Sequence, residues 1–207
     1  KNYKTKAKTI FYDNTQDLEK EFGIDSTNVN FKEPFLIDAI LALCVSKIIT
    51  NKVDYNKINT FIQDPHKLEE FKDFKNRLWV DDSKATNVDA TIQALKTYKK
   101  KKIYLILGGD DKGADLKPLF TELKDCDVEL YLIGKNSDTL NDLSIKYNVN
   151  AKKVDYLNNA VNEINDDYNA SNNSVAMLSP AAASLDQFSS YKDRGEKFKE
   201  FINSLSN

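Results

Sequence analysis

A lysine and two hydroxyl side chains lie between an apolar strand and the start of a helix. The segment reads Asp81-Asp82-Ser83-Lys84-Ala85-Thr86-Asn87; the residues around it predict a strand at 77–81 and a helix at 87–98 with Asn87 as N-cap. In parallel sheets, ligands bind beyond the carboxyl ends of strands, where the next helix attracts anions. The segment fits a phosphate or carboxylate site, although a well-capped turn without function would look the same.

Two further polar segments also follow apolar strands. The first, Gly108-Gly109-Asp110-Asp111-Lys112-Gly113-Ala114-Asp115, contains three of the six glycines of the chain. Glycine lets the backbone approach a ligand closely, and Lys112 supplies a mobile cation. The second, Ser179-Pro180-Ala181-Ala182-Ala183-Ser184-Leu185-Asp186-Gln187-Phe188, has mostly small side chains that leave room for a ligand.

Predicted strands and helices alternate from residue 77 onward. The strands are expected at 77–81, 102–107, 128–133, 152–155 (weak) and 174–178, and the helices at 87–98, 115–124, 137–147, 157–168 and 191–204. This alternation predicts an α/β fold with a Rossmann-like, mainly parallel sheet and helices on both faces. All three polar segments then follow carboxyl ends of strands, so we expect them to converge at one edge of the sheet.

The three segments resemble motifs of the Mur ligases of peptidoglycan synthesis. The matching residues are 82–87, 107–115 and 178–188, in the order and spacing of that family's C-terminal domain. Mur ligases also have a central ATPase domain, yet no Gly-x-x-x-x-Gly-Lys-Ser/Thr loop occurs here. The resemblance predicts the incomplete tail of the central domain at 1–73 and the complete amino-acid-binding domain at 74–207.

The residues before 74 give a weaker pattern. Residues 9–12 are a possible strand, 34–50 a broadly apolar helix that needs a covering partner, and 54–75 a mostly helical or linking stretch.

The resemblance implies an ATP-dependent C–N ligase that adds D-glutamate to UDP-N-acetylmuramoyl-L-alanine through an acyl phosphate. It implies ATP and Mg²⁺ as cofactors, with the magnesium ligands mainly outside this chain, and small-molecule substrates as partners. Without a phosphate-binding loop, we expect the chain alone to be inactive. The alternatives are another Mur-type or folylpolyglutamate-type ligase, or an inert small-molecule-binding module.

The resemblance also implies roles for individual residues. Lys84 and His66 are expected at the reacting phosphate, although a lone histidine in a linker is more often incidental. The D-glutamate site is expected to comprise Thr86, Lys112, Ser184, Leu185 and Tyr191. The nucleotide site is expected to comprise Asp82, at the ribose, with Lys67 and Asp38. Lys67 and Asp38 stand where the family has an arginine and an asparagine, which weakens these two expectations.

Composition excludes several other classes of protein. The net charge of −2 gives no basic footprint for nucleic acid, and we interpret the lysines at 99–102 as a solvated helix end. Apolar runs are far shorter than the ~20 residues that span a bilayer. One histidine and two cysteines are too few for a zinc cluster, so no metal site is expected. The sequence also lacks the Gly-x-Gly-x-x-Gly motif of dinucleotide-dependent oxidoreductases, which argues against that class. We expect a cytoplasmic monomer.

Overall fold

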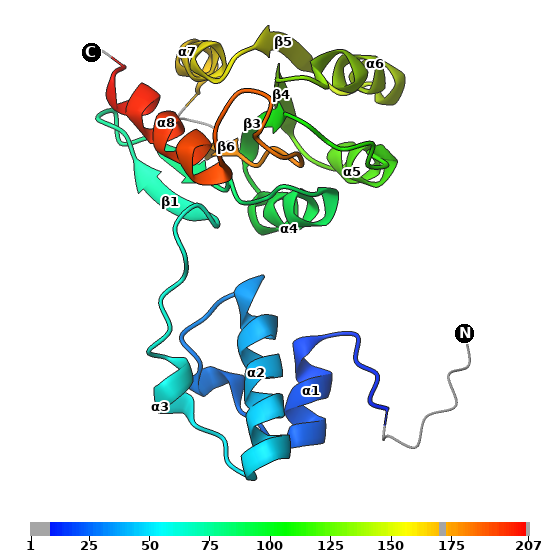
Figure 1. The fold of residues 1–207 in the computed structure, drawn as a ribbon, viewed down its shortest axis with the longest axis vertical. Coiled ribbons are helices and arrows are strands. Elements are labelled where there is room, and N and C mark those ends of the chain that lie inside the picture. The colour runs from blue at the N-terminus through cyan, green and yellow to red at the C-terminus, as the bar shows by residue number, and fades with distance from the viewer. Residues whose placement is uncertain (1–8, 170–172, 206–207) are drawn as a thin grey trace. The chain divides into compact units, whose positions relative to one another are not determined.

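The computed structural model describes residues 9–169 and 173–205 and separates the chain into two compact units (Figure 1). The units are Lys1–Gln63 and Asp64–Asn207. The division lies at 63/64, before the boundary expected at 73/74, because residues 69–72 pair with the sheet of the second unit. No helix in the described parts of the chain is long and apolar enough to cross a membrane.

The first unit is a small helical assembly. Its elements are α1 (Thr15–Phe22), a 3₁₀ turn η1 (Ser26–Asn28), α2 (Phe35–Thr50) and α3 (Tyr55–Ile58). Leu18 of α1 packs against Ile40 and Leu43 of α2 in its core. Helix α2 confirms the helix predicted at 34–50, and its apolar residues Ile48 and Ile49 stay exposed.

The strand considered at 9–12 does not form, and the prediction was wrong. A strand with apolar side chains is stabilised when these side chains pack against a core. The side chain of Phe11 is 89% exposed, so it contributes no such packing. Helix α1 begins shortly afterwards, where the side chain of Asn14 accepts a hydrogen bond from the N–H of Asp17. The cap at Asn14 therefore sets where the first regular element of the chain begins.

The second unit contains a six-stranded sheet. Its strands are β1 (Glu69–Lys72), β2 (Leu78–Asp81), β3 (Lys102–Gly108), β4 (Val128–Ile133), β5 (Ala151–Asp155) and β6 (Ser174–Leu178). The spatial order is β1-β2-β6-β3-β4-β5, and only β1 is antiparallel to its neighbour. The Rossmann-like, mainly parallel α/β fold predicted from the sequence is confirmed.

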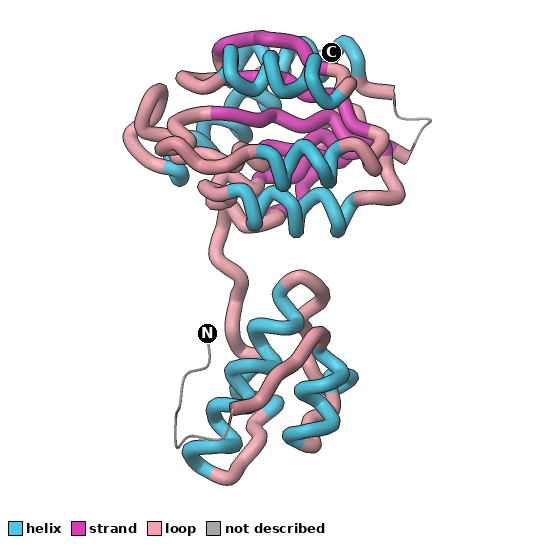
Figure 2. Tube along the Cα trace, turned by 90° about the vertical axis from the view of Figure 1, so that its right-hand side faces the viewer, coloured by secondary structure: helices cyan, strands magenta, loops and turns pink. Residues whose placement is uncertain are grey.

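Helices cover both faces of this sheet (Figures 1 and 2). Helices α4 (Val88–Tyr98), α5 (Lys117–Leu123) and α6 (Ser137–Tyr147) pack on one face, and α7 (Leu157–Asp167) and α8 (Tyr191–Asn203) on the other. Successive residues of β3 serve the two faces: Leu105 joins the first core and Ile106 the second. Burial on both faces explains why β3 and β4 are almost wholly apolar.

Strand β1 was not predicted, because the sequence suggested a helical or linking segment there. Its sequence, Glu-Glu-Phe-Lys, carries little apolar signal. It forms at the edge of the sheet, where only one side needs a partner: Phe71 pairs with Trp79 and packs into the second core. Its position at the edge allows the charged side chains to remain in water.

Candidate functional site

The loops after β2, β6 and β3 meet at one edge of the sheet, as the sequence predicted. The N–H of Asp82 donates to the carbonyl of Leu178 at 2.9 Å, which joins the ends of β2 and β6. Asp110 and Ala183 exchange two backbone hydrogen bonds of 2.9 Å, which join the glycine-rich loop after β3 to the small-residue loop after β6. The three motifs therefore form one continuous surface.

Lys84 lies on this surface, between an acid and an aromatic ring. Its Nζ is 3.1 Å from Asp64 Oδ2 and 5.6 Å from the ring centre of Tyr191. The hydrogen bond to Asp64 raises the pKa of Lys84. The Asp64 side chain is 65% exposed, so an anionic ligand can replace it at little cost. This arrangement suits binding of a phosphate or carboxylate by Lys84.

Asp82 points into the protein. Its two carboxyl oxygens accept hydrogen bonds from the N–H of Leu68, at 3.1 Å, and the hydroxyl of Ser179, at 2.7 Å. Burial raises the pKa of Asp82 to about 7. These contacts join the start of β1 to the ends of β2 and β6 beneath the surface. The contact of Asp82 to a ribose stays a prediction.

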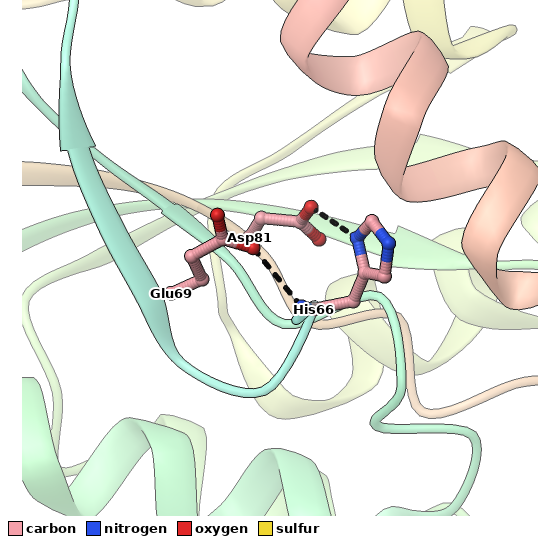
Figure 3. A group of neighbouring side chains, drawn as sticks. All are labelled: His66, Glu69 and Asp81. Atoms are coloured by element: carbon pink, nitrogen blue, oxygen red, sulfur yellow. Dashed lines mark hydrogen bonds and ion pairs between the residues drawn. The ribbon is translucent and has the colours of Figure 1, made fainter. Parts of the chain in front are cut away.

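His66 is buried, and its ring lies next to the carboxylate of Asp81 (Figure 3). Its Nδ1 is 2.7 Å from Asp81 Oδ2, and its backbone N–H donates to Glu69 Oε2 at 3.1 Å. Its carbonyl accepts the N–H of Lys84 at 3.0 Å, and its ring meets Tyr191 edge-on, with centres 6.2 Å apart. Several elements therefore hold His66 in place, so it is not an incidental surface histidine.

Arg194 joins two of the three loops from below. This side chain of α8 is 1% exposed. Its Nε donates to the hydroxyl of Ser83 at 2.9 Å, and its Nη2 donates to the carbonyls of Ser83 and Ala182 at 2.8 and 3.1 Å. Burial lowers the pKa of Arg194 to about 10, and its Nη1 has no partner among the described residues. The guanidinium fixes the spacing between the first and third motifs.

The glycine-rich loop is packed tightly on its neighbour. A Cβ at Gly109, where φ is 145°, would lie 2.3 Å from the carbonyl oxygen of Ala183. The carboxylate of Asp110 accepts the N–H of Lys112 and sets the turn that presents this lysine, whose side chain is exposed. Gly109 therefore permits the contact between the loops, and Asp110 places Lys112 at their rim.

The remaining predicted residues differ in how they are placed. Ser184 is buried in the third loop, whereas the side chain of Leu185 is 67% exposed and Thr86 lies exposed before α4. Lys67 has its Nζ 4.0 Å from Asp64. Asp38 is exposed on α2, in the other compact unit.

Several residues of the site were missed from the sequence. Asp81 was assigned to the strand, and Arg194 and Gly195 lie in a helix that carried no motif. The spacing of the buried residues of α8 places them on one face of the helix; they are Arg194, Gly195, Phe198 and Ile202. A charged residue on the buried face of a helix is almost always paired with another group, which is the signal that could have found Arg194.

One trio among the described residues has the donor atoms of a metal site: His66, Glu69 and Asp81. The Nζ of Lys199 lies 2.8 Å from both Glu69 oxygens and 3.7 Å from Asp81 Oδ2. An ammonium therefore already pairs with these carboxylates, and the trio does not fit a magnesium ion, which requires several oxygen ligands in an octahedron.

Comparison with known proteins identifies relatives of this chain. Residues 68–182 match the family model described as Mur ligase, glutamate ligase domain. The UDP-N-acetylmuramoylalanine–D-glutamate ligase of Campylobacter jejuni strain 81-176 is 50% identical over 204 residues, which are 99% of this chain and 50% of the relative. The same-named protein of Helicobacter pylori strain 26695 is 49% identical over 208 residues, covering 96% of this chain and 49% of the relative. The chain spans about half the length of these relatives.

Solved structures share the fold at low sequence identity. A UDP-N-acetylmuramate–alanine ligase from Thermotoga maritima matches with a TM-score of 0.55 and 16% identity, over 80% of this chain and 36% of that one. A Mycobacterium tuberculosis folylpolyglutamate synthase, solved with ADP and AMPPCP, matches with a TM-score of 0.58 and 12% identity. The match covers 82% of this chain and 40% of that one. With the family match covering more than half of its residues, the chain belongs to the Mur ligase family.

Proposed function

We propose that this chain is the amino-acid-binding part of a ligase that adds D-glutamate to UDP-N-acetylmuramoyl-L-alanine with ATP. The observation that carries the proposal is the convergence of the three motif loops at the carboxyl edge of β2, β6 and β3. Relatives of about 50% identity bear the name of that enzyme. We also propose that the first compact unit is the tail of the central ATPase domain and that the second is the C-terminal domain.

The D-glutamate site is proposed to lie where the glycine-rich and small-residue loops meet. Lys112 is exposed at the rim, where its ammonium can pair with a carboxylate. The hydroxyl of Thr86 is proposed to donate to the same carboxylate as Lys112. The hydroxyl of Ser184 and the backbone N–H of Leu185 can donate to the second carboxylate. Tyr191 contributes from the first turn of α8, whose N-terminus favours negative charge. Two carboxylates on one small ligand require two such groups of donors.

The phosphate end of the site is proposed at Lys84, with Lys67 and His66 nearby. Both lysines lie within 4.0 Å of Asp64, so their charges are concentrated in one region. Asp38 stays a predicted nucleotide contact from the first unit. ATP supplies the phosphoryl group that activates the carboxylate of the substrate, and Mg²⁺ is proposed to bind residues outside this chain.

These residues serve the reaction by placing its components. Lys84 stabilises charge on phosphoryl oxygens, where electrostatic stabilisation matters most. The D-glutamate donors hold the amine of D-glutamate towards the activated carboxyl carbon, and such positioning contributes a large share of rate acceleration. Arg194 and Asp82 keep the loops rigid during the reaction. The ligase is proposed to be a cytoplasmic monomer, and this chain alone is proposed to bind ligands without turnover.

The test is the amino-acid requirement of the full-length protein. With UDP-N-acetylmuramoyl-L-alanine, ATP and magnesium, we expect phosphate release to depend on D-glutamate and to be absent with L-glutamate. L-Alanine and a diamino acid serve as controls for other Mur-type ligases, and a folate substrate with L-glutamate serves for the folylpolyglutamate type. Phosphate release with one of these controls and not with D-glutamate would refute the proposal.

A further inference from the structure

We propose that Asp81 is a positioning residue that orients His66 and determines which ring nitrogen faces a ligand. Asp81 is fully buried at the end of β2, and its Oδ2 lies 2.7 Å from His66 Nδ1. Its Oδ1 accepts the N–H of Ser83 at 3.1 Å, which fixes the carboxylate in turn. The functional part of this inference rests on the proposed ligase activity, whereas the geometric part does not.

The chemistry of the pair assigns the proton. A carboxylate in this position accepts, so Nδ1 of His66 must carry the hydrogen that joins them. Nε2 is then the ring nitrogen that remains for a ligand. Figure 3 shows this second nitrogen on the side of α8, away from Asp81. Since the ring of His66 meets Tyr191 edge-on and its carbonyl holds Lys84, Nε2 belongs to the proposed phosphate end of the site.

The surroundings support this orientation of the ring. A Cβ at Gly195 would lie 2.2 Å from Nδ1 of His66 and 2.8 Å from Oδ2 of Asp81. Only a glycine on this face of α8 leaves space for the pair. Lys199 lies 3.7 Å from Oδ2 of Asp81 and also pairs with Glu69, so the buried carboxylate does not lack a compensating charge.

A backbone constraint reinforces the arrangement. His66 has a φ of 64°, in the left-handed region that few non-glycine residues occupy. Its N–H donates to Glu69 and its carbonyl accepts from Lys84, so both backbone groups are engaged. Backbone conformations of this kind persist where the surrounding structure fixes them, and they are frequent at functional sites.

The first experiment records the ring nitrogens of His66 by long-range ¹H–¹⁵N NMR at alkaline pH. His66 is the only histidine of the chain, so the assignment is direct. We expect Nδ1 to carry the hydrogen in the unmodified protein and the hydrogen to move largely to Nε2 in Asp81→Ala. Asp82→Asn, which alters the neighbouring buried acid, is the matched control and should leave the ring unchanged. A hydrogen on Nε2 in the unmodified protein, or an unchanged ring in Asp81→Ala, would overturn the proposal.

The second experiment is a double-mutant cycle in the full-length enzyme. We expect Asp81→Asn to lower kcat about 10-fold or more while the KM for D-glutamate changes little. In a His66→Gln background, the same change should have less than about a 3-fold effect, because Asp81 acts through the imidazole. Equal effects in both backgrounds would overturn the positioning role. If the proposed D-glutamate activity itself fails, the NMR result still decides whether Asp81 orients His66.

Discussion

Replacing Asp82 by asparagine should change how the stability of the second unit depends on pH. The folded-state pKa of Asp82 is about 7, against an ordinary value of 3.8, because the carboxyl is buried. A group with a raised pKa binds its proton more tightly in the folded state. Its stabilising contribution is therefore complete below pH 3.8 and is lost as the pH rises through 7.

The size of the effect follows from the same two values. At a pH well above 7, ionised Asp82 destabilises the fold by about 4 kcal/mol relative to its protonated form. Between pH 5 and pH 7 the free energy of unfolding of the unmodified protein falls by about 2 kcal/mol through this group. Asparagine has a similar size and cannot ionise. The free energy of unfolding of Asp82→Asn should therefore rise by about 2 kcal/mol relative to that of the unmodified protein over this interval.

Urea unfolding followed by tryptophan fluorescence measures this directly. Trp79 is the only tryptophan and is fully buried in the second unit, so its emission reports the unfolding of that unit. The quantity to plot is the difference in free energy of unfolding between variant and unmodified protein at pH 5, 6, 7 and 8. The exposed Asp142→Asn of α6 controls for the change of net charge. A difference for Asp82→Asn that stays constant with pH, or falls, would refute the reasoning.

Three further substitutions test the packing of the site, each by urea unfolding at Trp79. Gly195→Ala would gain up to ~1 kcal/mol in an ordinary helix, but the clash with His66 should give a net loss of about 1–2 kcal/mol. Arg194→Lys keeps the charge but loses the guanidinium hydrogen bonds to Ser83 and Ala182, so we expect the free energy of unfolding to fall by about 2 kcal/mol. Gly109→Ala should lose about 2 kcal/mol or more, since its Cβ meets the backbone of Ala183. Stability equal to the unmodified protein would contradict each expectation.

Much of the second unit was predictable because its signals are local. Strands β3 and β4 are continuous apolar runs, and Asn87 caps α4 with its side chain, as expected. The convergence of the motifs also followed from sequence, because the carboxyl ends of parallel strands meet at one edge. Strand β1 could not be found in this way, since its formation depends on pairing with β2 and on one half-buried side chain, Phe71.

The interior of the site depends on contacts between distant residues. Arg194 reaches Ser83 from more than a hundred positions away in the chain, and no spacing rule connects them. The motif includes Asp82, but only the structure shows that its carboxyl turns inward to Ser179. Sequence indicates which residues gather at a sheet edge, whereas tertiary packing decides which of their side chains face the ligand.

The central claim is that the joined loops hold D-glutamate, and the KM for D-glutamate of full-length Lys112→Ala and Ser184→Ala tests it most directly. Lys117→Ala, an exposed lysine on α5, is the matched control for loss of charge. We predict that the KM for D-glutamate rises about 10-fold or more in both site variants, while the KM for ATP stays within about 2-fold and the control is unaffected. An unchanged KM for D-glutamate in both site variants would contradict the account.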